Sequence, residues 1–262
     1  MDAIDSLKSA YIRELLAKGS REDSRGMFDF RPVSVKAGFV ENAEGSAQVD
    51  LGATRVLVGI KMQVEEPMED TPDQGNLMVS AELLPLAHAE FETGPPSPES
   101  IELARVVDRG IRAAKAIDLS SLSIDAEKAW TVFIDLYVLN YDGNLFDASA
   151  LAAMCALKTT KVPKEENGKA IYSERKDKLK IDNVALSTTF GKIGNALVLD
   201  MDIHEENTAD TRLTITNDGK LVRAMQKGIG GNLSMHEIDG LVGISTEKFN
   251  ELNKYVSQVS EQ

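Results

Sequence analysis

Two groups of short β-branched runs, each broken by turn residues, place the strongest constraint on the fold of this chain. In the first group, VSVKAGFV, SAQVDL and TRVLVGIKMQV follow one another between positions 31 and 65, joined by ENAEG and GA. In the second, VALSTTFGKIG, ALVLDMDI, TRLTITNDG and KLVRAMQKGIGG alternate in the same way, and Asn217–Gly219 is a hairpin signal. Such runs predict antiparallel strands. We therefore expect two β-rich regions, with a hint of internal duplication.

Four segments around these regions predict helices. The first, IDSLKSAYIRELLAKG, ends on Gly19 and places apolar side chains at helical spacing: Ile4, Leu7, Ala10, Tyr11, Leu15 and Leu16. The second, SIELARVVDRGIRAAKAID, follows a proline-rich stop and has an apolar line of Ile101, Ala104, Val107 and Ile111. The others are the apolar LFDASALAAMCALKTTK and the C-terminal SMHEIDGLVGISTEKFNELNKYV. Strands and helices in this order predict a layered α+β fold.

Composition and charge narrow the classes of function. The net charge of −13 disfavours nucleic-acid binding over the whole surface, so any such binding requires a local cluster of Lys and Arg. No run reaches the roughly 18 to 20 apolar residues that cross a membrane, so we expect a cytoplasmic protein with no membrane partner. Cys155 is the single cysteine and lies in an apolar run, which predicts a buried inert thiol rather than a nucleophile.

The sequence lacks the residue patterns of several common metal-binding, nucleotide-binding and catalytic sites. The histidines at 88, 204 and 236 stand far apart and show no metal-ligand spacing, so we expect no metal. No phosphate-binding loop of the Walker type occurs, and GIGG at 228–231 is best interpreted as a turn. No arrangement of serine, histidine and aspartate supports nucleophilic catalysis. We therefore expect no cofactor.

Several separate stretches together resemble one family. RGMFDFRPVSVKAGFVENAEGSAQVDLGATRVLVGIK, ELARVVDRGIRAAKAIDL, VLNYDGN and VLDMDIHEENTADTRLTITNDGKLV are similar to the RNase PH family of phosphorolytic 3′-to-5′ exoribonucleases. Within it, DTPDQGNLMVSAELLPLA followed by GPPSPESIELARVVDRGIR resembles the non-catalytic RNase PH-like subunit of the archaeal exosome.

The resemblance implies a fold and an assembly. It implies a single RNase PH-like domain over residues 1–262, with an N-terminal helix at 1–19, a core at 25–228 and a C-terminal helix at 234–256. The core would consist of two β-α-β-α-type halves with mixed or antiparallel sheets. The implied partners are a catalytic RNase PH-like subunit in a hetero-oligomeric ring arranged as a trimer of dimers, RNA-binding cap proteins, and single-stranded RNA.

One motif of the active relatives is altered here. They continue the strand and turn as Asp-Gly-Gly-Thr/Ser-Arg, where a helix N-terminus and an arginine hold inorganic phosphate. In this chain Leu145 and Phe146 stand where the hydroxyl and the arginine would be, and Asp147 places a carboxylate at the expected helix start. A capping carboxylate would use the donors that phosphate needs and would repel it. We therefore expect no phosphate to bind here.

The acidic stretch VLDMDIHEENTAD is altered as well. Of three aspartates in active relatives, this sequence keeps the first as Asp200, has Glu206 at the second and Arg212 at the third. Glutamate adds one methylene, about 1.5 Å, and a misplacement of about 1 Å can cost on the order of a hundredfold in rate. An alternative is that Asp202, Glu205 and Glu206 form a solvated turn. Both interpretations predict no activity, so no catalytic residue is assigned.

Three arginines of the second predicted helix are the remaining functional candidates. Arg105, Arg109 and Arg112 recur at spacings of four and three and so share one helix face. From spacing alone, ion pairing with Glu102, Asp108 and other acids is the simpler interpretation. The resemblance implies that this helix faces a central channel, where the arginines would bind RNA phosphates.

Three hypotheses follow: a non-catalytic ring subunit that scaffolds its partner and grips RNA, an active phosphate-dependent 3′-to-5′ exoribonuclease, and an assembly protein that does not touch RNA.

Overall fold

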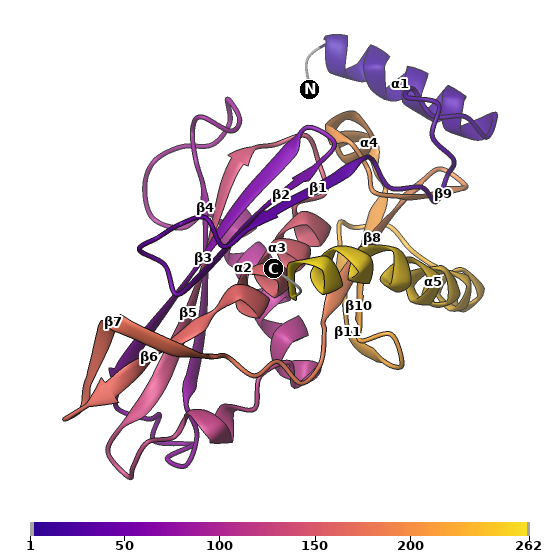
Figure 1. The fold of residues 1–262 in the computed structure, drawn as a ribbon. Helices are drawn as coiled ribbons and strands as arrows, with labels where there is room; N and C mark the ends of the chain where they lie inside the picture. The colour runs from indigo at the N-terminus through magenta and orange to yellow at the C-terminus, as the bar shows by residue number, and fades with distance from the viewer. Residues whose placement is uncertain (1–2, 261–262) are drawn as a thin grey trace.

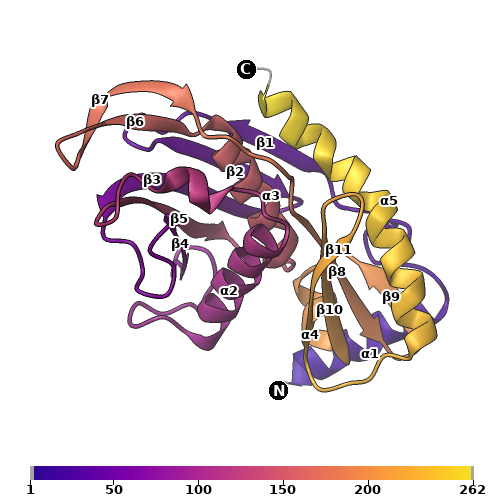
Figure 2. The ribbon, with the colours of Figure 1, turned by 90° about the horizontal axis from the view of Figure 1, so that it is seen from below.

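Two β-sheets lie side by side with helices packed between and over them (Figures 1 and 2). The structure is a computed structural model and describes residues 3–260, with side chains from residue 6 onward apart from those of 176 and 260. The predicted α+β class is confirmed. The predicted packing of the Ile4 side chain lies outside the described residues. No helix in the described range is long and apolar enough to cross a membrane.

The first sheet is mixed and has the order β1-β2-β3-β5-β4. Its only parallel pair is β4 with β5, because α2 and a short 3₁₀ helix, η1, carry the chain back across the sheet. The other pairs are antiparallel, which confirms the predicted meander. The bounds are β1 (Val33–Ala37), β2 (Gly45–Leu51), β3 (Thr54–Glu65), β4 (Asn76–Leu83), α2 (Pro98–Ala113), η1 (Leu119–Leu122) and β5 (Ala129–Asn140).

The second sheet is antiparallel throughout and has the order β11-β10-β8-β9. The predicted hairpin joins β10 to β11, although its turn is longer than the sequence signal suggested. The Asp218 carboxylate accepts from the backbone N–H groups of Lys220 and Leu221 and so fixes this turn. The bounds are β8 (Leu186–Ile193), β9 (Ala196–Leu199), β10 (Thr211–Asn217) and β11 (Val222–Gly228), with a separate hairpin of β6 (Lys161–Glu166) and β7 (Lys169–Lys178).

Helix α3 (Leu145–Thr159) is the centre of the molecule. It contacts strands of both sheets, and α2 and α5 (Met235–Ser260) pack beside it. Twelve of its 15 residues are buried, which explains why its sequence is apolar on every face. Cys155 is fully buried here, as predicted, and burial raises the pKa of its thiol to about 12.

Helix α1 (Ala3–Ala17) packs with a different face from the one its spacing predicted. Ile12 and Leu16 are buried against the second sheet, whereas Leu7 and Tyr11 are 73% and 47% exposed. The predicted apolar line was therefore wrong for Leu7, Ala10 and Tyr11, since Ala10 is exposed as well. The helix is rotated so that Arg13, on the edge of the buried face, makes an ion pair of 2.8 Å with Asp210 just before β10.

Helix α2 agrees better with its prediction. Ala104, Val107 and Ile111 are buried against the first sheet and α3, but Ile101, in the first turn, is 47% exposed. The hydroxyl of Ser97 accepts from the backbone N–H of Ser100 and starts the helix, as proline-rich segments followed by serine predict.

Candidate functional site

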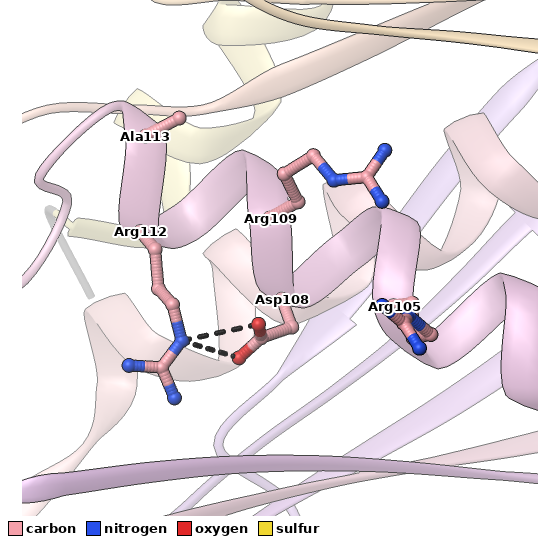
Figure 3. Close-up of a pocket in the computed structure, with 5 residues that line it drawn as sticks. All are labelled: Arg105, Asp108, Arg109, Arg112 and Ala113. Carbon is pink, nitrogen blue, oxygen red and sulfur yellow. Dashed lines mark hydrogen bonds and ion pairs between the residues drawn. The ribbon is translucent and has the colours of Figure 1, made fainter.

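The exposed face of α2 presents the three predicted arginines together. Because the apolar line is buried, Arg105, Arg109 and Arg112 all point away from the core. With Asp108 and Ala113 they line an open groove of about 410 Å³ (Figure 3). The shared face predicted from their spacing is thus present in the structure.

The three arginines differ in how far their charge is neutralised. The Nε of Arg112 donates to Asp108 at 2.9 Å, and its Nη2 donates to the backbone carbonyl of Leu77. Arg109 donates to the side-chain oxygen of Gln226 at 2.8 Å, which is a neutral partner. Arg105 has no hydrogen bond or ion pair to any residue that the structure describes. The pairing interpretation therefore holds for Arg112, while Arg105 and Arg109 keep uncompensated positive charge.

Gln226, on β11, connects the arginine face to the acidic stretch. Its amide nitrogen lies 3.4 Å from a carboxylate oxygen of Glu102, which in turn accepts from Arg212 at 2.8 Å. Arg212 also lies 3.7 Å from Glu206 and stacks over the ring of Phe146 at 4.3 Å. Glu102 was expected to pair with the α2 arginines, but it pairs with Arg212 instead because β10 and β11 lie beside α2.

The carboxylate of Glu206 lies at the N-terminus of α3. It accepts from the backbone N–H of Asn144 at 3.0 Å and from the hydroxyl of Tyr141 at 3.1 Å. Burial raises the pKa of Glu206, while the N–H of Asn144 and the charge of Arg212 oppose that shift. The Asn144 N–H, one of the donors at this helix end that favour an anion, is therefore already bonded to a carboxylate of the chain itself.

Asp147 does not cap α3, which corrects the prediction made from its position. Asn144, in a left-handed conformation with φ of 53°, is the capping residue, and its side chain accepts from the Asp147 N–H. The Asp147 carboxylate instead points into the core, where it accepts from the N–H of Thr189 at 2.9 Å and its hydroxyl at 2.7 Å. Burial raises the pKa of Asp147 to about 7.

Asp200 is fully buried and every contact of its carboxylate is internal. It accepts from Nε and Nη2 of Arg31 at 3.0 and 2.8 Å, from Arg25 at 2.9 Å, and from the amide of Asn144 at 2.7 Å. Burial opposes its ionisation, but the guanidinium and backbone N–H of Arg31 and the amide of Asn144 together outweigh burial and lower the pKa of Asp200. Asp200 therefore ties Arg31, before β1, to the start of α3.

The rest of the acidic stretch forms a short helix, α4 (Ile203–Thr208), which the sequence interpretation missed. Asp202 and Glu205 make a reciprocal capping box, a signal that was present in the sequence as D-x-x-E. Glu205 is buried and forms a bidentate ion pair with Arg21, with Nε at 2.9 Å. The solvated-turn alternative is therefore wrong for Glu205 and Glu206.

The described residues contain no group of three or more His, Cys, Asp or Glu side chains placed to hold a metal ion. His88 packs against the rings of Phe91 and Tyr141, with ring centroids 5.5 and 5.4 Å away.

Comparison with known proteins gives consistent matches over nearly the whole chain. Residues 29–163 match the model for domain 1 of the 3′ exoribonuclease family, RNase PH, and residues 183–248 match that for domain 2. The chain is 47% identical over 249 residues to "Exosome complex component Rrp42" of Thermococcus gammatolerans, covering 93% of this chain and 91% of that protein. It is 46% identical over 262 residues to the protein of the same description from Sulfurisphaera tokodaii, covering 96% and 95%.

Solved structures agree with these relatives. A chain of the structure described as the Archaeoglobus fulgidus exosome with RNA bound to the active site superposes with a TM-score of 0.90 at 45% identity, covering 97% of this chain and 99% of that one. A chain of an archaeal exosome core gives a TM-score of 0.84 at 42% identity, covering 98% and 97%.

Proposed function

Since this chain belongs to the 3′ exoribonuclease family of RNase PH proteins, we propose that it is a non-catalytic subunit of an archaeal RNA exosome ring. In this role it scaffolds a catalytic RNase PH-like partner and helps bind RNA in the channel during 3′-to-5′ phosphorolytic degradation. The identity to exosome components over more than nine tenths of the chain supports membership of such a complex.

The observation that carries the non-catalytic role is the position of Glu206. Its carboxylate takes the N–H of Asn144 and faces Arg212, so an incoming phosphate would meet a negative charge where it needs donors. Asp200 supports the same conclusion: it is fully buried and its oxygens are committed to Arg31, Arg25 and Asn144. A carboxylate held in this way cannot reach a substrate or exchange a proton with it.

RNA binding is proposed for the α2 face. Arg105 and Arg109 line an open groove without an acidic partner among the residues that the structure describes, which supports the proposal that they bind phosphates of a single strand. Arg112 contributes less because Asp108 already lies 2.9 Å from it. A net charge of −13 is compatible with this role, because only a few cations are needed at the channel.

Assembly is proposed to use surfaces that are apolar yet exposed. Leu7 and Tyr11 share one face of α1, and Val222 and Met225 are exposed on β11, the edge strand of the second sheet. Such surfaces suit contacts with a sister subunit that alternates with this chain in a trimer of dimers. The ring is proposed to carry RNA-binding cap proteins and to lie in the cytoplasm. As in the sequence-based prediction, residues 1–262 are proposed to form a single RNase PH-like domain.

The first test is a phosphorolysis assay on the purified chain with 3′-extended single-stranded RNA, Mg²⁺ and inorganic phosphate. We expect no nucleoside diphosphates from the chain alone, and release of diphosphates after addition of the catalytic partner. Phosphate-dependent product from the lone chain would establish the alternative, an active exoribonuclease.

The second test separates RNA binding from scaffolding alone. In the reconstituted ring, Arg105→Ala or Arg109→Ala should lower the salt slope of single-stranded RNA binding by about 0.7 per lost contact, and Arg112→Ala should lower it less. If all three variants assembled into normal rings with unchanged salt slopes of RNA binding, the chain would be an assembly protein that does not bind RNA.

A further inference from the structure

The outer edge of the first sheet is open along β1. At the two ends of the antiparallel pairing with β2, the C=O of Pro32 accepts from the N–H of Gly52, and the N–H of Gly38 donates to the C=O of Ser46. Because backbone groups alternate in direction along a strand, the even-numbered residues between them also direct their N–H and C=O groups toward β2. The N–H and C=O groups of Val33, Val35 and Ala37 therefore point outward. Within the part of the chain that the structure describes, none of these outward groups has a hydrogen-bond partner.

A groove of about 470 Å³ runs beside this edge and is walled by the last turns of α5. Figure 2 shows the C-terminal end of α5 next to β1. On the helix, Tyr255, Gln258 and Val259 line the groove, and their spacing of three and four places them on one face. On the strand, Val35 and Ala37 belong to the face that packs toward the core. The groove thus lies where the inward side chains of a further strand would be placed.

The charge of Lys36 favours an acidic ligand at this groove. Lys36 also lines it and is exposed, without a hydrogen bond or ion pair to any described residue. Residues directly opposite each other on neighbouring strands share one face of the sheet. A strand added beside β1 would therefore be favoured if it placed an acidic side chain opposite Lys36.

We propose that this groove binds an extended segment of another protein chain, which joins the first sheet as a sixth strand beside β1. Its backbone pairs with the outward groups of Val35 and Ala37, as in other peptides that bind by strand addition. One inward aliphatic side chain packs on Tyr255 and Val259, and an acidic side chain pairs with Lys36.

RNA is a poorer occupant of this groove. One lysine offers a single phosphate contact, and the outward carbonyl oxygens of Val35 and Ala37 repel a phosphate backbone. An extended polypeptide, in contrast, supplies donors and acceptors in the alternation that the edge presents. The proposal is also independent of the exosome role, because it rests on β1 and α5 and not on the α2 arginines.

The test uses the full chain and a capped hexapeptide that alternates valine and glutamate, with a valine and lysine peptide as the charge control. The readout is amide hydrogen exchange at Val35 and Ala37. With the acidic peptide at ten times its Kd, exchange at these two amides should slow by about tenfold. The basic peptide should bind more weakly, and Lys36→Glu should reverse the preference.

A proline variant isolates the backbone contribution. Val35→Pro removes an outward N–H that β2 does not use, and proline is tolerated on edge strands in this orientation. It should abolish peptide binding, whereas the matched Val35→Thr, which keeps the N–H, should retain it. If Val35→Pro disturbs the amides that pair with β2, Ala37→Pro provides the same test.

Three results would overturn the proposal. They are unchanged exchange at Val35 and Ala37 with the acidic peptide, slowing by single-stranded RNA in place of the peptide, and protection that depends only on the concentration of the chain itself, which would indicate pairing between two copies.

Discussion

Gln226→Glu is the most informative single substitution for the arginine face. Arg109 now donates to a neutral amide oxygen at 2.8 Å, so it is oriented while its charge stays available. A carboxylate at the same position would keep the size of the side chain and neutralise that charge, although it would lose the donor that now lies 3.4 Å from Glu102. The substitution therefore changes electrostatics at Arg109 while leaving the arginine itself in place.

The magnitude follows from the exposure of this pair. An ion pair between exposed side chains is worth about 1 kcal/mol or less, and RNA must break it to reach Arg109. The substitution should therefore weaken RNA binding by up to about fivefold at low salt, and the salt slope should fall by about 0.7 because the added carboxylate cancels one positive charge at the RNA site. Gln226→Ala, which releases Arg109 but leaves its charge, should change the slope little.

The assay is fluorescence anisotropy of a labelled single-stranded RNA on the reconstituted ring, across a series of KCl concentrations. A double-mutant cycle with Arg109→Ala completes it, because the effect of Gln226→Glu should vanish once Arg109 is absent. Thermal unfolding of each variant controls for the contact of Gln226 with Glu102. The reasoning would be refuted if the Gln226→Glu ring bound RNA with the salt slope of the unmodified ring. It would also be refuted if Gln226→Glu weakened RNA binding equally in rings that carry Arg109→Ala.

Three further predictions concern buried groups. Because burial raises the pKa of Asp147 to about 7 from about 4 when unfolded, the folded state holds the proton more tightly, and stability from this group is lost as pH rises from 4 to 7. Asp147→Asn, whose amide can donate to the Thr189 hydroxyl, should remove up to about 4 kcal/mol of that pH dependence in urea unfolding; an unchanged pH profile would contradict this. Glu205→Ala should cost about 3 to 5 kcal/mol in the same measurement because Arg21 is left buried without a counter-charge, and a cost under about 1 kcal/mol would show that water reaches Arg21. The Cys155 thiol should react with a disulfide reagent only after unfolding, since its pKa is raised to about 12. If the folded protein reacted as fast as an exposed thiol, local opening around Cys155 would be indicated.

The sequence was a good guide wherever a local pattern decides the structure. Alternating β-branched runs located the strands, and the Arg105 and Arg109 spacing correctly placed both on one exposed face. It was a poor guide wherever the position of a side chain depends on a contact between two elements that are distant in the chain. Asp147 reads as a helix cap by position, yet the approach of β8 turns its carboxylate toward Thr189. No local signal links Gln226 to Arg109, since their contact exists only because β11 lies beside α2.

The rotation of α1 has the same origin. Leu7 belonged to the predicted apolar line and Ile12 did not, and the position of the second sheet selects Ile12 for burial. The short helix α4 was missed for a different reason, because its capping box was hidden in a run of acids that suggested a loop.

The burial of α3 on all sides has a consequence for how the molecule comes apart. Strands of both sheets pack on this one helix, and the second sheet has additional apolar clusters against α5 and α1. Loss of either half would expose the helix along its length. Unfolding should therefore proceed in one cooperative step, and a nick in the connection between β7 and β8 should release no fragment that stays folded by itself.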